Sequence, residues 1–345
     1  MLTYACDVEK DLAADRQQLR RLINGFQTSQ VLHALTVLGI PDQLGGGRRS
    51  AAALAEATGC NPPALYRLLR ASAALGVLDE DQSQGFALTP LGEGLRSDAA
   101  GSLAGWVDLI GTPNFWQNWG QLVDSVRTGE TGWRLRHGVD AWTYRSQHPE
   151  EGRVFDRAMV SLTGTHVEAL VRSYDFAPFR TIVDVGGGRG ALLAHILRAN
   201  PGSTGVLFDQ LHVVETAAAL LAEQGVDDRC RVEAGSFFES VPGGGDAYLL
   251  KSVLHDWYDP EARRILETCR KATAPEALLL VIENVLDPPN QGPETKLGDI
   301  NMLVGPGGQE RTAEDFAALL ASAGFTLRRV VRTTALHCVL EAAPA

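Results

Sequence analysis

The sequence predicts an α/β protein in which a Rossmann-like, doubly wound sheet follows an N-terminal α-helical domain of winged-helix type. From Thr181 onward, short apolar runs alternate with helical patterns, as in a parallel sheet covered by helices on both faces. A glycine-rich turn, Gly186 to Gly190, follows the first apolar run and opens a helix. The N-terminal part shows helical apolar spacing instead. We therefore expect three parts: a dimerisation-type domain over 1–100, a helical connector over 101–175 and a ligand-binding domain over 176–345.

The N-terminal domain is expected to contain helices and one hairpin. Apolar residues recur at helical spacing between 11 and 40. Ser50 and Asn61 are the predicted N-caps of two short helices. The runs 77–78 and 86–88 then flank a polar turn. Two short helices followed by a hairpin form a winged-helix pattern.

A winged helix raises the alternative of a DNA-binding regulator, and the charge of the chain argues against it. Between Ser50 and Arg96 there are three arginines and five acidic residues, and the whole chain carries a net charge of −11. Contacts to nucleic-acid phosphates require Lys and Arg, and anionic membrane surfaces also attract basic proteins. We therefore expect no nucleic acid and no membrane partner, and a homodimer formed through the apolar helical faces.

The expected compartment is the cytoplasm. No apolar run approaches the roughly 20 residues that a membrane-spanning helix needs. The first residues lack the basic and then apolar segments of a signal peptide. The chain has five scattered cysteines without a C-x-x-C pair, which predicts reduced thiols rather than a zinc site or disulfides.

Large aromatic side chains gather in the middle of the chain. Five of the six tryptophans lie there: Trp106, Trp116, Trp119, Trp133 and Trp142. Such rings suit either a core between helices or a pocket for a flat aromatic ligand, and the sequence leaves both interpretations open. The next predicted helix, 150–174, presents Phe155 and Met159 on one face at i, i+4 spacing.

The C-terminal half alternates predicted strands and helices. Strands are expected at 181–185, 205–208, 230–233, 246–250 and 277–282, with an antiparallel hairpin of 326–333 and 336–342 at the sheet edge. Helices are expected at 191–199, at 213–224, after an N-cap at Asp259, and at 316–323 after a capping box that begins at Thr312. In such sheets, ligands bind at the carboxyl ends of strands where the strand order reverses.

Two cofactors fit the predicted strand ends. Asp209 stands 23 positions after Gly186 and can accept both hydroxyls of a ribose. The G-x-G-x-x-A run that begins at Gly186 loosely matches the dinucleotide fingerprint, so an NAD(P)-dependent oxidoreductase is one alternative. S-adenosylmethionine is the other alternative. Because it has no pyrophosphate, the glycines would contact its methionine moiety and its ribose. The acid within the first strand, Asp184, and the final hairpin favour this methyl donor.

Several motifs, taken in order, carry a family resemblance. Residues 251–257 read Lys-Ser-Val-Leu-His-Asp-Trp, and they follow Val-Asp-Val-Gly-Gly-Gly at 183–188 and Phe-Asp at 208–209. Gly-Gly-Gln-Glu-Arg-Thr stands at 307–312. Together they resemble the caffeic-acid-type, or plant-like, small-molecule O-methyltransferases, many of them bacterial natural-product tailoring enzymes. The resemblance covers nearly the whole chain.

The resemblance implies a fold, a cofactor and a reaction. It implies the class I methyltransferase fold with an antiparallel last strand, and a homodimer in which the winged-helix-like region covers the partner's active site. It implies S-adenosylmethionine as the donor, S-adenosylhomocysteine as the product and no metal. The expected acceptor is a small aromatic secondary metabolite, as in antibiotic biosynthesis, methylated on a hydroxyl group, in particular a phenolic one.

The catalytic residues implied by the resemblance are His255, Glu283 and Glu310. His255 would be the general base, because an imidazole with a pKa of ~6.5 can take a proton from a phenol with a pKa of ~10 while the methyl group transfers in line. Glu283 and Glu310 would each hold one nitrogen of the ring and stabilise the imidazolium. Asp256 is expected to brace the loop.

The binding residues are implied in the same way. The implied donor contacts are Gly186, Gly188, Asp209, Ser236, Phe237 and Lys251. The family usually has aspartate where Ser236 stands, so we expect weaker anchoring of the adenine amino group by an uncharged hydroxyl. The implied acceptor contacts are Phe155, Met159, Trp257, Asn301 and Met302, whose thioether and aromatic groups suit a planar ring.

Overall fold

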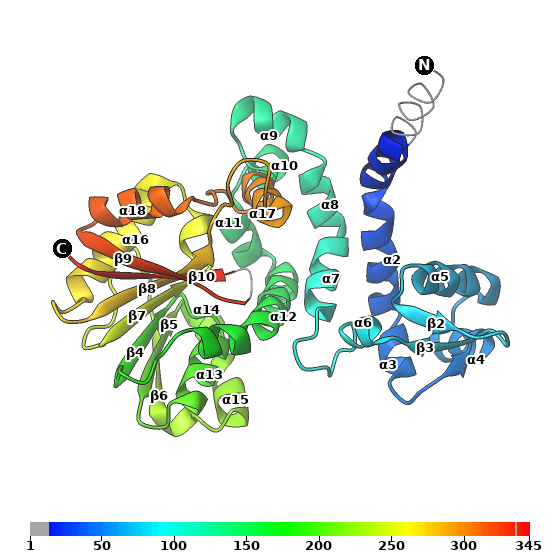
Figure 1. The fold of residues 1–345 in the computed structure, drawn as a ribbon, viewed down its shortest axis with the longest axis horizontal. Helices are drawn as coiled ribbons and strands as arrows, with labels where there is room; N and C mark the ends of the chain where they lie inside the picture. The colour runs from blue at the N-terminus through cyan, green and yellow to red at the C-terminus, as the bar shows by residue number, and fades with distance from the viewer. Residues whose placement is uncertain (1–13, 335–336) are drawn as a thin grey trace, which may run out of the picture. The chain divides into compact units, whose positions relative to one another are not determined.

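The computed structural model describes residues 14–334 and 337–345. Cys6 and the predicted starts of the first helix and of the last strand lie outside these residues. The chain splits into two compact units, one ending at Thr112 and the other beginning at Pro113 (Figure 1). This division differs from the predicted boundaries at 100 and 175. Trp106 belongs to the first unit, while the other four clustered tryptophans belong to the second.

The first unit is mainly helical and carries one small sheet. Its elements are α2 (Gly25–Val37), α3 (Ile40–Leu44), β1 (Arg49–Ser50), α4 (Ala51–Thr58), α5 (Pro62–Ala74), β2 (Leu78–Glu80), β3 (Gly85–Leu88), α6 (Pro90–Glu93) and α7 (Ala104–Gly111). Ser50 and Asn61 cap α4 and α5 as predicted, each accepting a backbone N–H in the first turn. Strand β1 adds a third strand to the expected hairpin, in the order β1-β3-β2.

The second unit begins with helices and continues as a sheet with crossing helices. The leading helices are α8 (Pro113–Trp119), α9 (Leu122–Thr128), α10 (Gly132–His137), α11 (Ala141–Gln147) and α12 (Pro149–Ser173). The strands are β4 (Thr181–Val185), β5 (Thr204–Asp209), β6 (Cys230–Ala234), β7 (Ala247–Lys251), β8 (Leu278–Asn284), β9 (Phe325–Arg332) and β10 (His337–Pro344). Between them lie α13 (Ala191–Ala199), α14 (Leu211–Val214), α15 (Ala217–Glu223), the 3-10 turns η1 (Asp227–Arg229) and η2 (Leu254–Asp256), α16 (Asp259–Ala272), α17 (Pro293–Val304) and α18 (Ala313–Ser322).

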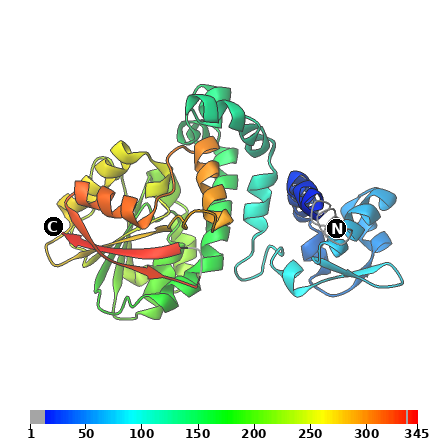
Figure 2. The same ribbon diagram turned by 45° about the horizontal axis from the view of Figure 1, so that its top comes forward.

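The strands of the second unit form one sheet in the order β6-β5-β4-β7-β8-β10-β9. The first five strands in this order are parallel, and β10 runs antiparallel to both β8 and β9. Figure 2 shows this terminal hairpin in red. The chain steps from β4 to β5 on one side and returns to β7 on the other, so the strand order reverses between β4 and β7. Ligands of doubly wound sheets bind at this point, at the carboxyl ends of the strands.

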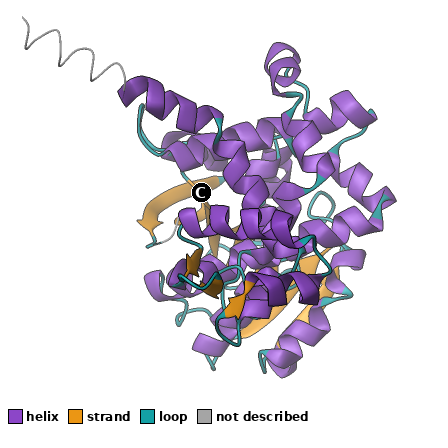
Figure 3. Ribbon diagram, turned by 90° about the vertical axis from the view of Figure 1, so that its right-hand side faces the viewer, coloured by secondary structure: helices purple, strands orange, loops and turns teal. Residues whose placement is uncertain are grey.

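Helices cover both faces of the sheet, and each face has its own core. Strand residues alternate between the two cores because successive side chains point to opposite faces. Val183 and Val281 face α16 and α18, whereas Ile182 and Ile282 face α12 and α13. Helix is the predominant secondary structure (Figure 3). Among the described residues, no helix is both long enough and apolar enough to span a membrane.

Two helix predictions need correction. The single helix expected over 213–224 is broken into α14 and α15, where the Thr216 hydroxyl donates to the carbonyl of Val213 and competes with helical bonding. Asp259 is the first residue of α16 and not its N-cap, which is Tyr258. The Asp259 carboxylate instead accepts hydrogen bonds from Arg311.

Candidate active site

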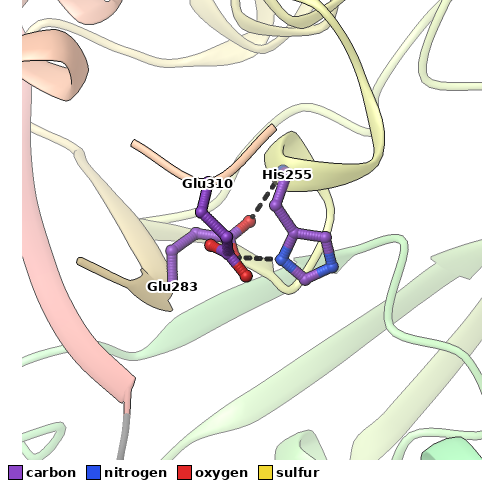
Figure 4. Close-up of side chains that lie close together, drawn as sticks. All are labelled: His255, Glu283 and Glu310. Atoms are coloured by element: carbon purple, nitrogen blue, oxygen red, sulfur yellow. Dashed lines mark hydrogen bonds and ion pairs between the residues drawn. The ribbon is translucent and has the colours of Figure 1, made fainter. Parts of the chain in front are cut away.

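His255 lies on η2, directly after β7, with its ring held by a buried carboxylate (Figure 4). Its Nδ1 is 2.6 Å from Oε2 of Glu283, a fully buried residue near the end of β8. Oε1 of Glu283 accepts the backbone N–H groups of Val253 at 3.0 Å and Leu254 at 2.9 Å. An ionised carboxylate only accepts hydrogen bonds, so Nδ1 carries the proton of this bond. The Nε2 nitrogen is therefore the one that can receive a proton.

Neighbouring carboxylates make His255 unusually basic. Burial alone would lower its pKa, but the charges of Glu283, Asp256 and Glu310, together with the Glu283 hydrogen bond, raise the pKa to about 10. Burial raises the pKa of Asp256 to about 6, and its Oδ1 lies 3.5 Å from Nε2 of His255. The same carboxylate charges would stabilise the imidazolium that forms when the ring takes a proton.

Glu310 lies beside this pair and contacts other groups. It is 6% exposed, and its Oε1 accepts a hydrogen bond from Nδ2 of Asn284 at 3.4 Å. Its Oε2 is buried and makes no hydrogen bond to any residue that the structure describes. Burial raises the pKa of Glu310 to about 7. The three residues expected to act together are thus close in space, but Glu283 alone bonds to the ring, and Asp256 is the carboxylate nearest Nε2.

The same three residues have the spacing of a possible metal site. One ligand atom from each of His255, Glu283 and Glu310 lies within 4.8 Å of the other two. However, Oε1 and Oε2 of Glu283 already accept the hydrogen bonds of the η2 turn and of Nδ1. Metal binding would have to displace these bonds, so the arrangement favours a hydrogen-bonded base over a metal centre.

Arg311 holds the turn that carries His255, a role that the sequence analysis did not assign. Its side chain is 1% exposed and donates to the carbonyls of Leu254 and Trp257, each at 2.9 Å. It also donates to Oδ1 of Asp259 at 2.8 Å. Its place in the 307–312 motif could have indicated that Arg311 is important, but the sequence does not show which distant carbonyl groups it contacts.

The glycine turn after β4 forms one side of the predicted donor site. The N–H of Gly186 donates to the carbonyl of Phe208, and that of Gly188 donates to Oδ2 of Asp209, both at 2.8 Å. Gly186 has a φ of +71°, and a Cβ there would lie 2.9 Å from Cγ2 of Val253. Glycine therefore allows both this left-handed backbone and the close approach of the turn to Val253. The Asp209 carboxylate is oriented by backbone N–H groups and keeps lone pairs for a ribose.

Asp184, which is buried, and Lys251, which is half-buried, lie beside this turn. Asp184 is 1% exposed, and burial raises its pKa to about 7. Its Oδ2 accepts no hydrogen bond from the described residues. Burial lowers the pKa of Lys251, although the charges of Glu283 and Asp184 oppose this shift. A buried carboxylate oxygen without a donor suits a cationic ligand such as S-adenosylmethionine, so the residues present fit this cofactor.

Ser236 and the aromatic residues after β6 complete the predicted donor side. The Ser236 hydroxyl accepts the N–H of Phe238 at 3.3 Å. Trp257, predicted to line the acceptor site, packs edge-to-face against Phe237 and Phe238, with ring centroids 6.3 and 4.8 Å apart. The structure therefore places Trp257 among the predicted donor residues.

The other predicted acceptor residues come from α12 and α17. Phe155 on α12 meets Trp142 edge-to-face at 5.6 Å. On α17, Oδ1 of Asn301 accepts a hydrogen bond from Nε1 of Trp119 at 3.2 Å. Met159 and Met302 are half-buried. Part of the tryptophan cluster therefore lies against residues that were predicted to hold the acceptor.

Comparison with known families gives two matches along the chain. Residues 119–326 match the O-methyltransferase domain, and residues 20–98 match the O-methyltransferase dimerisation domain.

Curated relatives extend these matches to nearly the full chain. The chain is 40% identical to the phenazine O-methyltransferase PhzM of Lysobacter antibioticus, covering 94% of this chain and 95% of the relative. It is 41% identical to the O-demethylpuromycin-O-methyltransferase of Streptomyces alboniger, covering 95% and 89%. It is also 41% identical to the 8-amino-8-demethylriboflavin N,N-dimethyltransferase of Streptomyces davaonensis, covering 90% of each.

Solved structures agree with these relatives. The crystal structure of LaPhzM superposes with a TM-score of 0.91 at 39% identity and covers 96% of this chain and 99% of that one. Human N-acetylserotonin methyltransferase in complex with SAM gives a TM-score of 0.89 at 29% identity, covering 96% and 98%.

Proposed function

The chain belongs to the family of S-adenosylmethionine-dependent O-methyltransferases, and from this premise we propose that His255 is the base that deprotonates a phenolic hydroxyl of a small aromatic acceptor. The observation that carries the proposal is the 2.6 Å hydrogen bond between Nδ1 of His255 and buried Glu283. This bond orients the ring and leaves Nε2 for the acceptor proton. Membership of this family argues against the two alternative functions, an NAD(P)-dependent oxidoreductase and a DNA-binding regulator.

The proposed mechanism assigns each polar group one task. Nε2 of His255 accepts the hydroxyl proton, and Glu283 stabilises the imidazolium that forms. Asp256 and Glu310 add to the basicity of the ring when they are ionised. The bound donor supplies an electrophilic methyl group on a sulfonium sulfur. Transfer forms the oxygen–carbon bond as the carbon–sulfur bond breaks, so positioning and deprotonation are the main contributions of the chain.

Hydroxyl methylation suits this base better than amine methylation. A neutral amine already has a free electron pair, whereas a phenol must lose its proton to become a strong nucleophile. One relative carries the name of an N,N-dimethyltransferase, and two others are named as O-methyltransferases. The basic imidazole supports assigning this chain to the second group.

We assign the donor and acceptor contacts as the resemblance implied, with one change. Gly186, Gly188, Asp209, Ser236, Phe237 and Lys251 would hold S-adenosylmethionine, and Trp257 would join them. Phe155, Met159, Asn301 and Met302 would contact the acceptor. No metal takes part in this scheme. The four described cysteines are free thiols, which suits the cytoplasm as the proposed compartment.

The test is the variant His255→Ala. We expect its methyl transfer rate to fall by about 10²- to 10⁴-fold, the usual contribution of a general base. Its affinity for S-adenosylhomocysteine, measured by calorimetry, should stay within about twofold. The assays should be run with and without EDTA, which we expect to leave the wild-type rate unchanged. A variant with near wild-type turnover would exclude His255 as the base.

A further inference from the structure

Arg145 is a half-buried cation, with a buried Nη1, that the proposed mechanism does not use. It lies on α11, and its guanidinium carbon stands 3.7 Å above the centre of the Phe155 ring and 5.1 Å from that of Trp142. The centre of the Trp133 ring lies 5.6 Å from the same guanidinium carbon. The three rings hold the guanidinium in one place and withdraw it from water.

The hydrogen-bonding capacity of Arg145 is not satisfied. Its Nη1 is buried and donates to no residue that the structure describes. Nε1 of Trp142, three residues earlier on the same face of α11, is also buried and lacks an acceptor among these residues. Both groups can only donate. Buried donors without acceptors are rare in folded proteins, and each calls for an explanation such as a bound ligand.

The position of Arg145 places these donors near the proposed reaction centre. Phe155, which stacks on the guanidinium, is a proposed acceptor contact. Asp256 lies close enough for the Arg145 charge to lower its pKa, against the larger effect of burial, and Asp256 adjoins His255. Burial lowers the pKa of Arg145 to about 10, although Asp256, Asp156 and Glu151 oppose this shift by their charge. Arg145 therefore remains a cation at neutral pH.

We propose that Arg145, together with Trp142, binds a carboxylate on the aromatic acceptor, so that the enzyme prefers hydroxylated aromatic acids. A guanidinium presents a planar set of N–H donors that matches the two oxygens of a carboxylate. The rings of Phe155 and Trp142 hold these donors in advance, which reduces the entropy lost on binding. The inference rests on the proposed function, because it places the acceptor between Arg145 and His255.

The experiment compares matched acceptors and matched variants. Hydroxybenzoates and hydroxynaphthoates are assayed beside their carboxamides and methyl esters, which keep the ring and the hydroxyl but lack the charge. We expect the wild-type kcat/KM for the acid to exceed that of its neutral partner by about 10- to 100-fold, the range for hydrogen bonds to charged groups. Arg145→Gln should lose this preference, because its kcat/KM should fall much more for the acids than for their neutral partners. Arg153→Gln, an exposed residue on α12, is the control and should keep the preference.

Binding of 1-naphthoate in the presence of S-adenosylhomocysteine provides a readout without turnover. This acid has no hydroxyl to methylate, so it tests the carboxylate site even if the enzyme methylates no compound in the panel. Failure to methylate any compound in the panel would count against the proposed function and not against the carboxylate site. We expect calorimetry to show naphthoate binding to the wild type and binding at least about tenfold weaker to Arg145→Gln.

Stability separates a binding role from a structural one. If Arg145 serves the ligand, Arg145→Gln should lower the Tm of the ligand-free protein by no more than about 5 °C, because Nη1 donates to none of the described residues and only the contacts with the three rings are lost. Arg145→Lys keeps the charge but not the planar set of donors, and it should weaken the preference only in part. An acid preference that survives in either variant at the wild-type level, or an equal loss on acids and neutral partners, would overturn the proposal.

Discussion

At the scale of single residues, the charge of Glu283 determines how basic His255 is. A protonated His255 cannot accept the acceptor proton, so active enzyme accumulates as pH rises through the His255 pKa. Because that pKa is raised to about 10, the acid limb of the kcat/KM profile should lie well above pH 6.5. Glu283→Gln keeps an oxygen for the N–H groups of the η2 turn but removes the charge. Its limb should move to lower pH by at least about one unit, with a lower plateau.

The acceptor itself ionises near the same pH, so the assignment needs a second acceptor. A phenol with an electron-withdrawing substituent has a lower hydroxyl pKa. If His255 produces the limb, the limb stays in place when this acceptor is used. If the acid limb of the kcat/KM profile shifts with the pKa of the acceptor, or if Glu283→Gln leaves its position unchanged, the proposed role of the His255–Glu283 pair is wrong.

The catalytic residues that the sequence could supply were those that the family resemblance implied. His255, Glu283 and Glu310 were named from the family resemblance, and the structure brings them together. Arg311 and Arg145 received no role, because their function depends on contacts that chain order does not reveal. Arg311 reaches back more than 50 positions to the η2 turn, and Arg145 is defined by rings from α10, α11 and α12.

At the scale of elements, the loop before α18 supports the turn that carries the base. Gly308 has a φ of +78°, and a Cβ there would lie 2.2 Å from the carbonyl oxygen of His255 and 2.3 Å from the backbone nitrogen of Trp257. These are backbone atoms and cannot move aside on their own. Gly308→Ala should therefore shift η2 and reduce kcat by at least about tenfold, because small displacements of a reacting group are costly.

Binding of the donor should change less than kcat, because Trp257 is the one proposed donor contact next to Gly308. The glycine turn and Asp209 lie at the ends of β4 and β5, away from the Gly308 contact. Calorimetry with S-adenosylhomocysteine should give a Kd within about threefold of the wild type. Gly243→Ala is the control, since no atom lies within 4 Å of its Cβ. Equal kcat values in the two variants would show that Gly308 does not position the base.

Element types were predictable where local signals were strong. The alternating apolar runs gave the parallel strands, and the Thr312–Asp315 capping box is present as expected. The misplaced N-cap at Asp259 has a tertiary cause, because the carboxylate bonds to Arg311 instead of to its own helix. The break between α14 and α15 comes from a local Thr216 bond that periodicity alone does not reveal.

At the scale of the whole molecule, the first unit leaves an apolar face uncovered. Leu19, Leu22 and Ile23 are 57%, 72% and 66% exposed, at the i, i+3, i+4 spacing of one helical face. The sequence predicted helical apolar spacing here, but it could not distinguish an internal core from a surface awaiting a partner. Together with the match to a dimerisation domain, this exposure supports the homodimer that the sequence analysis predicts.

Charge placed on this face should separate the two chains. We expect the wild type to have the mass of two chains by light scattering. Leu22→Asp should raise the dimer dissociation constant by at least about 100-fold, or about 2.8 kcal/mol, because the carboxylate would be desolvated against an apolar surface. Val123→Asp, at a similarly exposed position of the second unit (61%), should leave the dimer intact. A monomeric wild type, or a Leu22→Asp protein that stays dimeric at nanomolar concentration, would show that this face is not the interface.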